Sequence, residues 1–140
     1  MSKEPVQGLI VAHSSLAQGM AAAVRQISGA EEDALRTISN EGRGPEGLIS
    51  AVRDAAGDAP VILFTDMASG SCAFAARKIA MERANTGIVC GVNLPVLLDF
   101  VFHRDLPIGE LVERLVEKGR GGITGACTEE TKRADRAVSG

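Results

Sequence analysis

The fold is decided by the stretch Val6-Gln7-Gly8-Leu9-Ile10-Val11-Ala12-His13-Ser14-Ser15. A continuous apolar run ends there in a short polar turn, and a helical spacing of apolar residues begins at Leu16. This order predicts a buried strand followed by a helix, which is the opening of an α/β unit. His13 stands at the carboxyl end of the strand, where side chains of such sheets commonly face a ligand.

Strand and helix patterns alternate along the rest of the chain. Their spacing predicts strands over residues 7–12, 35–39, 61–65 and 86–91, and a short fifth strand over residues 123–127. Helices are predicted over residues 16–28, 45–56, 71–83, 94–102 and 108–118, with Gly119 to Gly122 breaking the pattern. Such alternation indicates a mostly parallel sheet with helices on both faces, and right-handed crossovers favour the strand order 2-1-3-4. We expect one domain over residues 1–127 and a polar, flexible tail over residues 128–140.

Composition excludes several classes of function. The net charge is −3, the basic residues are scattered, and Tyr and Trp are absent, so no surface for nucleic acid is expected. No apolar run reaches the roughly 18 residues of a membrane span, and the first five residues do not resemble a signal peptide. The cysteines at positions 72, 90 and 127 fit reduced thiols in a cytoplasmic protein and match no zinc-binding spacing.

The predicted strand order brings two chemical groups together. Chain direction reverses between the first and third strands, and a ligand crevice then lies at their carboxyl ends. His13 follows the first of these strands and Asp66 follows the third. Since neighbouring strands lie about 4.8 Å apart, we expect the two side chains to meet. The carboxylate would fix the imidazole tautomer and stabilise the cationic ring that forms when the other ring nitrogen accepts a phosphoryl group.

The predicted phosphate donors come from small residues beside this pair. Gly70 and Ser71 lead into the third helix, whose backbone N–H groups would favour an anion, and the Ser71 hydroxyl is a further donor. Ser14 stands at the start of the first helix and offers a second such end. No metal and no cofactor are predicted. Such a site is better suited to passing a phosphoryl group between carriers than to hydrolysing it.

Position in the sequence alone also allows a purely structural role for each of these residues. His13 can be a structural residue of the strand end, and Asp66 can be a helix cap. The loop Gly42-Arg43-Gly44 is interpreted as a plain turn in preference to a phosphate cradle. We interpret Cys72 as a small, half-buried helix residue, and His103 as a surface residue near a helix C-terminus.

Three segments together resemble a known family. They are Leu9-Ile10-Val11-Ala12-His13-Ser14-Ser15-Leu16-Ala17-Gln18-Gly19, Phe64-Thr65-Asp66-Met67-Ala68-Ser69-Gly70-Ser71 and Gly91-Val92-Asn93-Leu94-Pro95-Val96-Leu97-Leu98. The chain resembles the mannose-family enzyme IIA component of the bacterial phosphoenolpyruvate-dependent sugar phosphotransferase system. The likeness covers roughly residues 6–127 and includes the segment from Glu117 to Ile123.

The resemblance implies a flavodoxin-like three-layer fold and a homodimer, often with the last strand exchanged between subunits. It implies that Nε2 of His13 takes a phosphoryl group from phospho-HPr, a protein phosphocarrier, and passes it to an enzyme IIB partner. Asp66 would hold Nδ1, Ser71 would lie near the phosphate, and Gly91 to Pro95 would line the same edge. Because no IIB domain is attached, the expected acceptor is a separate polypeptide.

The chain departs from the family in the turn after Asp66. The family usually has Gly-Gly-Ser-Pro there and an Asn soon afterwards, whereas this chain has Ser69-Gly70-Ser71-Cys72 and then Ala73-Phe74. The alternatives are a regulatory module whose output is binding and a phosphotransfer subunit of dihydroxyacetone kinase, to which the His-Ser-Ser segment is also similar. A receiver domain that uses Asp66 as acceptor is disfavoured, since the first strand does not end in an acidic pair.

Overall fold

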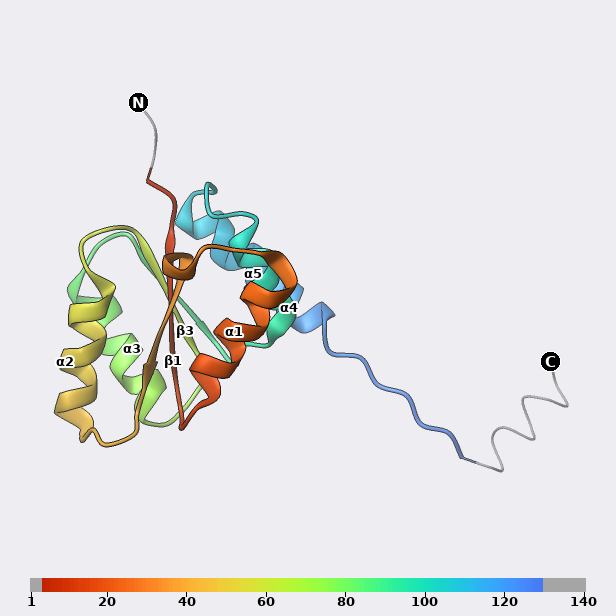
Figure 1. The fold of residues 1–140 in the computed structure, drawn as a ribbon, viewed down its shortest axis with the longest axis horizontal. Helices are drawn as coiled ribbons and strands as arrows, with labels where there is room; N and C mark the ends of the chain where they lie inside the picture. Colours follow the sequence, from red (N-terminus) through yellow and green to blue (C-terminus); the bar gives the residue numbers. More distant parts are fainter. Residues whose placement is uncertain (1–3, 130–140) are drawn as a thin grey trace, which may run out of the picture.

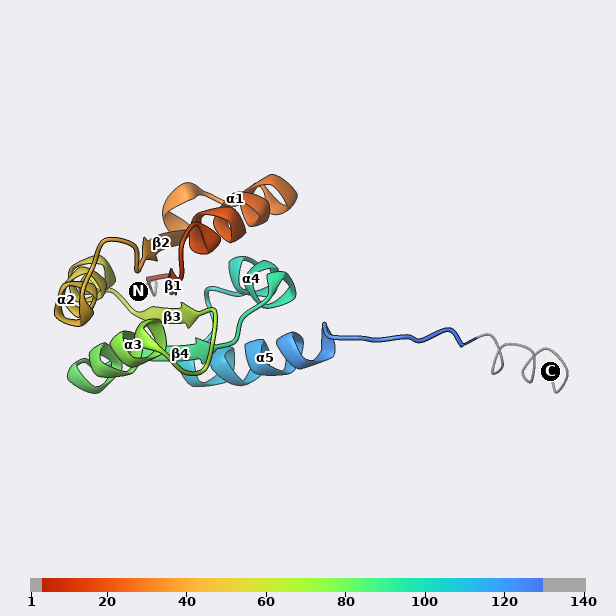
Figure 2. The ribbon, with the colours of Figure 1, turned by 90° about the horizontal axis from the view of Figure 1, so that it is seen from below.

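Four parallel strands form the central sheet of the computed structural model, which describes residues 4–129. The sheet, which runs through the centre of the molecule (Figure 1), has the order β2-β1-β3-β4, as predicted (Figure 2). Its strands are β1 (Gln7–Ala12), β2 (Leu35–Ser39), β3 (Val61–Thr65) and β4 (Thr86–Cys90). The chain runs from β1 outward to β2 and then crosses back to β3 on the other side of β1, so the direction of winding changes between β1 and β3.

Helices cover both faces of the sheet, which confirms the three-layer architecture (Figure 2). One face carries α1 (Leu16–Ser28), α4 (Leu94–Val101) and α5 (Ile108–Gly121), and the other carries α2 (Pro45–Ala56) and α3 (Ser71–Glu82). A short 3-10 helix, η1 (Glu32–Ala34), precedes β2. Among residues 4–129, no helix is both long enough and apolar enough to span a membrane.

The two inner strands are buried because both of their faces are covered. All five residues of β3 are inaccessible to solvent, and β1 is buried from Gly8 to Ala12. Phe64 points toward the α1–α4–α5 layer, where its ring meets that of Phe100 edge-on with centroids 5.1 Å apart. This accounts for the continuous apolar runs in the sequence, which are typical of central parallel strands.

Helix α5 continues through the glycine-rich segment that was predicted to end it. Gly119 lies against α4, and a Cβ added there would come within 2.7 Å of Cγ2 of Val96. The Asn93 side chain donates a hydrogen bond of 3.0 Å to the Gly119 carbonyl. Close packing of α5 on α4 therefore outweighs the weak helix propensity of glycine.

The predicted fifth strand is not confirmed. Residues 123–129 carry neither helix nor strand and extend away from the sheet (Figure 1). A strand needs a neighbour to pair with, and in the described part of the chain this segment pairs with no strand of the sheet. Of the tail predicted over residues 128–140, residues 130–140 lie outside the described residues.

Candidate active site at the ends of β1 and β3

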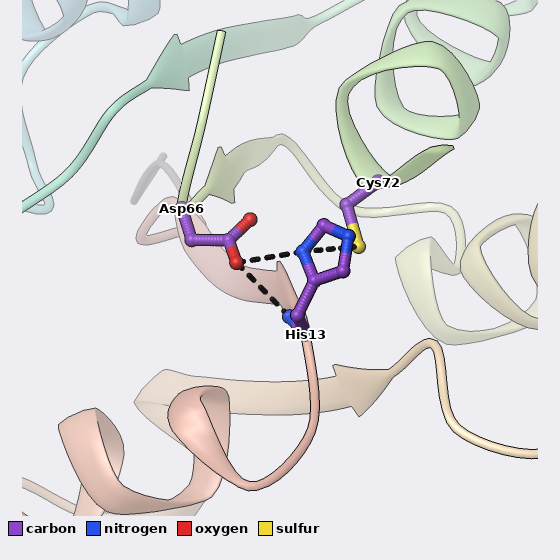
Figure 3. Close-up of side chains that lie close together, drawn as sticks. All are labelled: His13, Asp66 and Cys72. Carbon is purple, nitrogen blue, oxygen red and sulfur yellow. Dashed lines mark hydrogen bonds and ion pairs between the residues drawn. The ribbon is translucent and has the colours of Figure 1, made fainter. Parts of the chain in front are cut away.

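His13 and Asp66 are adjacent, as the strand order predicts. In the parallel pairing of β1 with β3, Val11 faces Thr65, so the residues that follow both strands emerge at one edge of the sheet. Oδ2 of Asp66 lies 2.8 Å from Nδ1 of His13 and also accepts the His13 backbone N–H at 3.0 Å (Figure 3). The carboxylate thus contacts both the ring and the main chain of one residue.

The environment of Asp66 favours its ionised form. Burial by itself raises the pKa of this carboxyl, but the hydrogen bonds from the backbone and ring of His13 together lower the pKa below its ordinary value. An ionised carboxylate has no proton to donate, so a neutral His13 ring carries its proton on Nδ1. Nε2 then keeps its lone pair, and the side chain of His13 is 40% exposed to solvent.

The turn after β3 brings the start of α3 to the His13 ring. Gly70 has φ +93° and occupies the N-cap position of α3, where a Cβ would lie 4.0 Å from Cε1 of His13. The Thr65 hydroxyl donates to the Met67 carbonyl at 2.7 Å and closes the turn from the strand side. Ser71, the first residue of α3, is exposed. The predicted residues Gly70 and Ser71 therefore lie at the same edge as His13.

Ser14 is held by the loop that follows β2. It has φ +55°, its backbone N–H donates to Oδ1 of Asn40 at 3.1 Å, and its carbonyl accepts the Ser39 hydroxyl at 2.7 Å. Its own hydroxyl donates to Oε1 of Glu41 at 3.3 Å. In this arrangement the Ser14 hydroxyl is directed to a carboxylate, and its phosphate-binding role stays a prediction.

Two helix N-termini at this edge are uncapped by side chains. Neither α1, with Ser15 at the N-cap, nor α3, with Gly70, has a side-chain cap or an acidic residue in its first turn. By contrast, Asn93 caps α4 by accepting the Val96 N–H. In α1 the N–H of Leu16 already donates to the His13 carbonyl at 3.1 Å. The other first N–H groups of α1, and those of α3, have no carboxylate neighbour within their own helix, which suits them to an anion.

Cys72 also belongs to this site, which the sequence interpretation missed. Its side chain is fully buried in the first turn of α3, and Sγ lies 3.8 Å from Nδ1 of His13 (Figure 3). Burial raises the pKa of the thiol, and the nearby Asp66 charge raises it further. No spacing in the sequence signals this contact, because it depends on where the turn places the first residues of α3. His13, Asp66 and Cys72 are the residues here that could hold a metal ion.

The remaining candidate site residues have structural roles or lie at the border of the site. His103 is remote from the site, where its Nδ1 lies 2.8 Å from the Asp99 carbonyl at the end of α4. In the Gly42-Arg43-Gly44 loop, Nε of Arg43 donates to the Ser39 carbonyl. The segment from Gly91 to Pro95 follows β4 at the site's edge, and the Gly91 N–H donates to the Thr65 carbonyl at 2.9 Å.

Comparison with known proteins gives one family. The family model described as "PTS system fructose IIA component", EIIA-man, matches residues 8–116. That range includes β1 except Gln7, all of β3, the turn after β3 and most of α5. No curated protein matches the chain.

Solved structures with the same fold are similar over most of their length. The phosphotransferase system component EIIA from Streptococcus agalactiae has a TM-score of 0.79 and 21% identity, over 86% of this chain and 96% of that chain. The mannose/sorbose specific IIA subunit from Enterococcus faecalis has a TM-score of 0.77 and 19% identity, over 91% and 98%. The PTS IIA protein associated with the fucose utilization operon from Streptococcus pneumoniae has a TM-score of 0.74 and 23% identity, over 89% and 96%. At these identities the likeness shows a common fold.

Proposed function

Because the chain belongs to the EIIA-man family of phosphotransferase system (PTS) components, we propose that it is a histidine phosphocarrier of sugar uptake. His13 accepts a phosphoryl group from phospho-HPr and passes it to an enzyme IIB partner. Asp66 orients the ring, while Ser71, Gly70 and Ser14 bind the phosphoryl oxygens. Both exchanges take place in the cytoplasm.

The hydrogen bond of 2.8 Å between Nδ1 of His13 and Oδ2 of Asp66 carries this proposal. The lone pair of Nε2 forms a bond to phosphorus while the N–P bond of the donor breaks and returns its electron pair to the donor's ring. The proton on Nδ1 stays in place, so the phosphorylated ring is cationic. The adjacent Asp66 carboxylate stabilises that cation without itself taking the proton.

The phosphoryl oxygens are bound by backbone N–H groups. The uncapped starts of α1 and α3 both open at the edge where His13 lies. Their partial positive charge favours an anion, and the turn into α3 needs glycine at position 70 because its φ of +93° is one that other residues rarely adopt. The Ser71 hydroxyl adds a side-chain donor at the first position of α3.

Protein partners dock on apolar side chains around His13. Leu16, Met67 and Phe74 are large apolar residues that are 46%, 49% and 59% exposed. Each is local to the site: Leu16 donates its N–H to the His13 carbonyl, Met67 follows Asp66, and the Phe74 N–H bonds the Gly70 carbonyl. Exposed apolar groups near a reactive centre are typical of surfaces that bind another protein.

We also propose that two copies of the chain associate through the free edge of β4. Within residues 4–129, β4 has a strand neighbour on one side only, and Ile123 just beyond α5 is 75% exposed. Pairing of residues 123–127 with β4 of a second copy would give the free edge of β4 a hydrogen-bonded neighbour and would cover the exposed Ile123 side chain. Sedimentation of the full chain should give a dimer, and removal of residues 123–140 should give a monomer; a full chain that sediments as a monomer contradicts this association.

Transfer to a partner tests the function itself. The chain is first phosphorylated with phosphoenolpyruvate, enzyme I and HPr, then separated from them and mixed with a mannose-family enzyme IIB. We expect the label to move to enzyme IIB, as intact mass measures directly. Label that stays on the chain would contradict the transport role and favour the regulatory module.

A further inference from the structure

Three metal-ligating side chains meet where β1, β3 and α3 converge. His13, Asp66 and Cys72 each offer one ligand atom, and these atoms all lie within 4.8 Å of one another (Figure 3). We infer that these residues form a Zn²⁺ site whose occupation blocks phosphorylation of His13. The metal site stands on the geometry alone, whereas its inhibitory effect rests on the proposed function.

One oxygen of Asp66 has no partner in the described chain. Oδ2 accepts both hydrogen bonds from His13, while Oδ1 is buried without a hydrogen bond, and the side chain as a whole is only 9% exposed. Buried acceptors are almost always satisfied, so a lone carboxylate oxygen indicates a missing cation or donor. A metal ion bound to Oδ1 would satisfy it while Oδ2 keeps its bond to the His13 backbone.

The set of donor atoms selects zinc among the common cations. An imidazole nitrogen, a carboxylate oxygen and a thiolate sulfur are zinc ligands, whereas Mg²⁺ and Ca²⁺ prefer oxygen alone. With bonds of roughly 2.0–2.3 Å, two ligand atoms of one tetrahedral zinc ion lie about 3.3–3.6 Å apart. Nδ1 of His13 already lies 3.8 Å from Sγ of Cys72, close to that spacing, and the ligand atoms of the three residues all lie within 4.8 Å of one another.

Binding requires a turn of the His13 ring. The ring lies between the carboxylate and the sulfur (Figure 3), so Nδ1 must leave its hydrogen bond with Oδ2 to face both ligands. The side chain is 40% exposed and so has room to turn, and water can fill the fourth position from the solvent side. Cys72 gives up its thiol proton to solvent on binding.

Zinc on Nδ1 removes the nucleophile. A neutral imidazole that binds a metal through Nδ1 carries its one proton on Nε2, so the Nε2 lone pair is no longer available to phosphorus. The phosphorylated ring, in turn, keeps a proton on Nδ1 and cannot bind the metal there. Zinc binding and phosphorylation therefore exclude each other, and each lowers the apparent affinity for the other.

Cys72 is the ligand that can be replaced without changing His13 or Asp66, the two residues of the proposed phosphotransfer. It occupies the position at which the resembled family usually has proline, and proline offers no metal ligand. The inhibition should therefore depend on Cys72, which allows the metal effect to be separated from the phosphotransfer chemistry.

Direct metal binding is measured on the purified full chain. Calorimetric titration with Zn²⁺ should show one ion per chain, and Co²⁺ in its place should give the near-ultraviolet absorption band of a cobalt–thiolate bond. Both Cys72→Ser and Cys72→Ala should weaken zinc binding at least tenfold and abolish the band. Cys127→Ser, which removes an exposed cysteine outside the cluster, should retain both. A band that persists in Cys72→Ser, or a titration that shows no binding, overturns the site.

Inhibition is measured separately, with isolated phospho-HPr as donor. Each variant's labelling rate in Zn²⁺ is divided by its own rate in chelator, so that changes in basal rate cancel. We expect at least a tenfold drop for the native chain and for Cys127→Ser, and less than twofold for Cys72→Ser. Equal inhibition of all three overturns the exclusion. If no labelling occurs even in chelator, the proposed function fails, while the titration still decides the metal site.

Discussion

Nδ1 of His13 and Oδ2 of Asp66 lie 2.8 Å apart, although 53 positions separate the two residues in the sequence. The parallel pairing of β1 with β3 brings them together, because Val11 faces Thr65 and both strands end at the same edge. The carboxylate also holds the His13 backbone at 3.0 Å, so the position and the tautomer of the ring are fixed by one side chain.

Replacing the carboxylate by an amide should slow phosphoryl transfer while the fold persists. Asp66→Asn keeps the shape of the side chain but removes the charge that stabilises the cationic ring. Since a hydrogen bond to a charged group contributes about 1.5–3 kcal/mol, we expect a rate about 10- to 100-fold lower. The rate is measured from labelling by phospho-HPr in reactions quenched at successive times, and circular dichroism checks the fold. An unchanged rate would remove Asp66 from the mechanism.

The stabilising contribution of Asp66 should be lost in acid. Its pKa in the folded chain lies below the ordinary value, so the unfolded chain takes up this proton first as the pH falls. The contribution of Asp66 to the free energy of unfolding is complete above the pKa of about 3.9 that this carboxyl has in the unfolded chain. The contribution declines as the pH falls through the lower pKa of the folded chain. Urea unfolding should therefore show a larger stability difference between the native chain and Asp66→Asn at pH ~6 than at pH ~3. A stability difference between the two chains that is larger at acidic pH would contradict the lowered pKa of Asp66.

An acidic residue at Phe74 should weaken the transfer reaction with HPr. Phe74 is 59% exposed in the first turn of α3, beside the site, and a carboxylate there would remove apolar contact with the partner. We expect Phe74→Glu to lower the rate at limiting phospho-HPr about tenfold. Met81→Glu is the matched control, since Met81 is 87% exposed at the far end of the same helix. Equal effects of the two variants would argue against a docking surface around His13.

The packing of α5 on α4 gives a prediction about stability. Gly119→Ala would place a Cβ within 2.7 Å of Val96 and should cost about 1–3 kcal/mol of unfolding free energy. Gly109→Ala lies in the same helix with no neighbour within 4 Å and should be neutral or stabilising by about 0.4–1 kcal/mol. Urea unfolding compares them, and equal stabilities would mean that Gly119 is not needed for close contact.

Much of the fold was accessible to sequence reasoning because the central strands are buried on both faces. The run Val61–Thr65 is apolar for that reason, and the same alternation of strands and helices leads to the order β2-β1-β3-β4. Once that order is known, the meeting of His13 and Asp66 follows from the geometry of a parallel sheet. The sequence therefore predicted the pair without any local motif that joins the two residues.

The features that were missed depend on packing between elements. Cys72 reaches the His13 ring because of the path of the turn through Gly70, which has φ +93° and which no periodicity encodes. Helix α5 continues past Gly119 because of contacts with α4. The segment 123–127 has strand-like residues, yet a strand also requires a partner edge, and within residues 4–129 this segment pairs with none.

The central claim is that His13 accepts the phosphoryl group. It is tested most directly by the intact mass of the native chain and of His13→Ala after incubation with phosphoenolpyruvate, enzyme I and HPr. Mapping is done under alkaline conditions, in which phosphohistidine survives. We expect one phosphoryl group on the native chain, located on His13, and none on the variant. Full labelling of His13→Ala, or a phosphoryl group found on another residue of the native chain, would contradict the account.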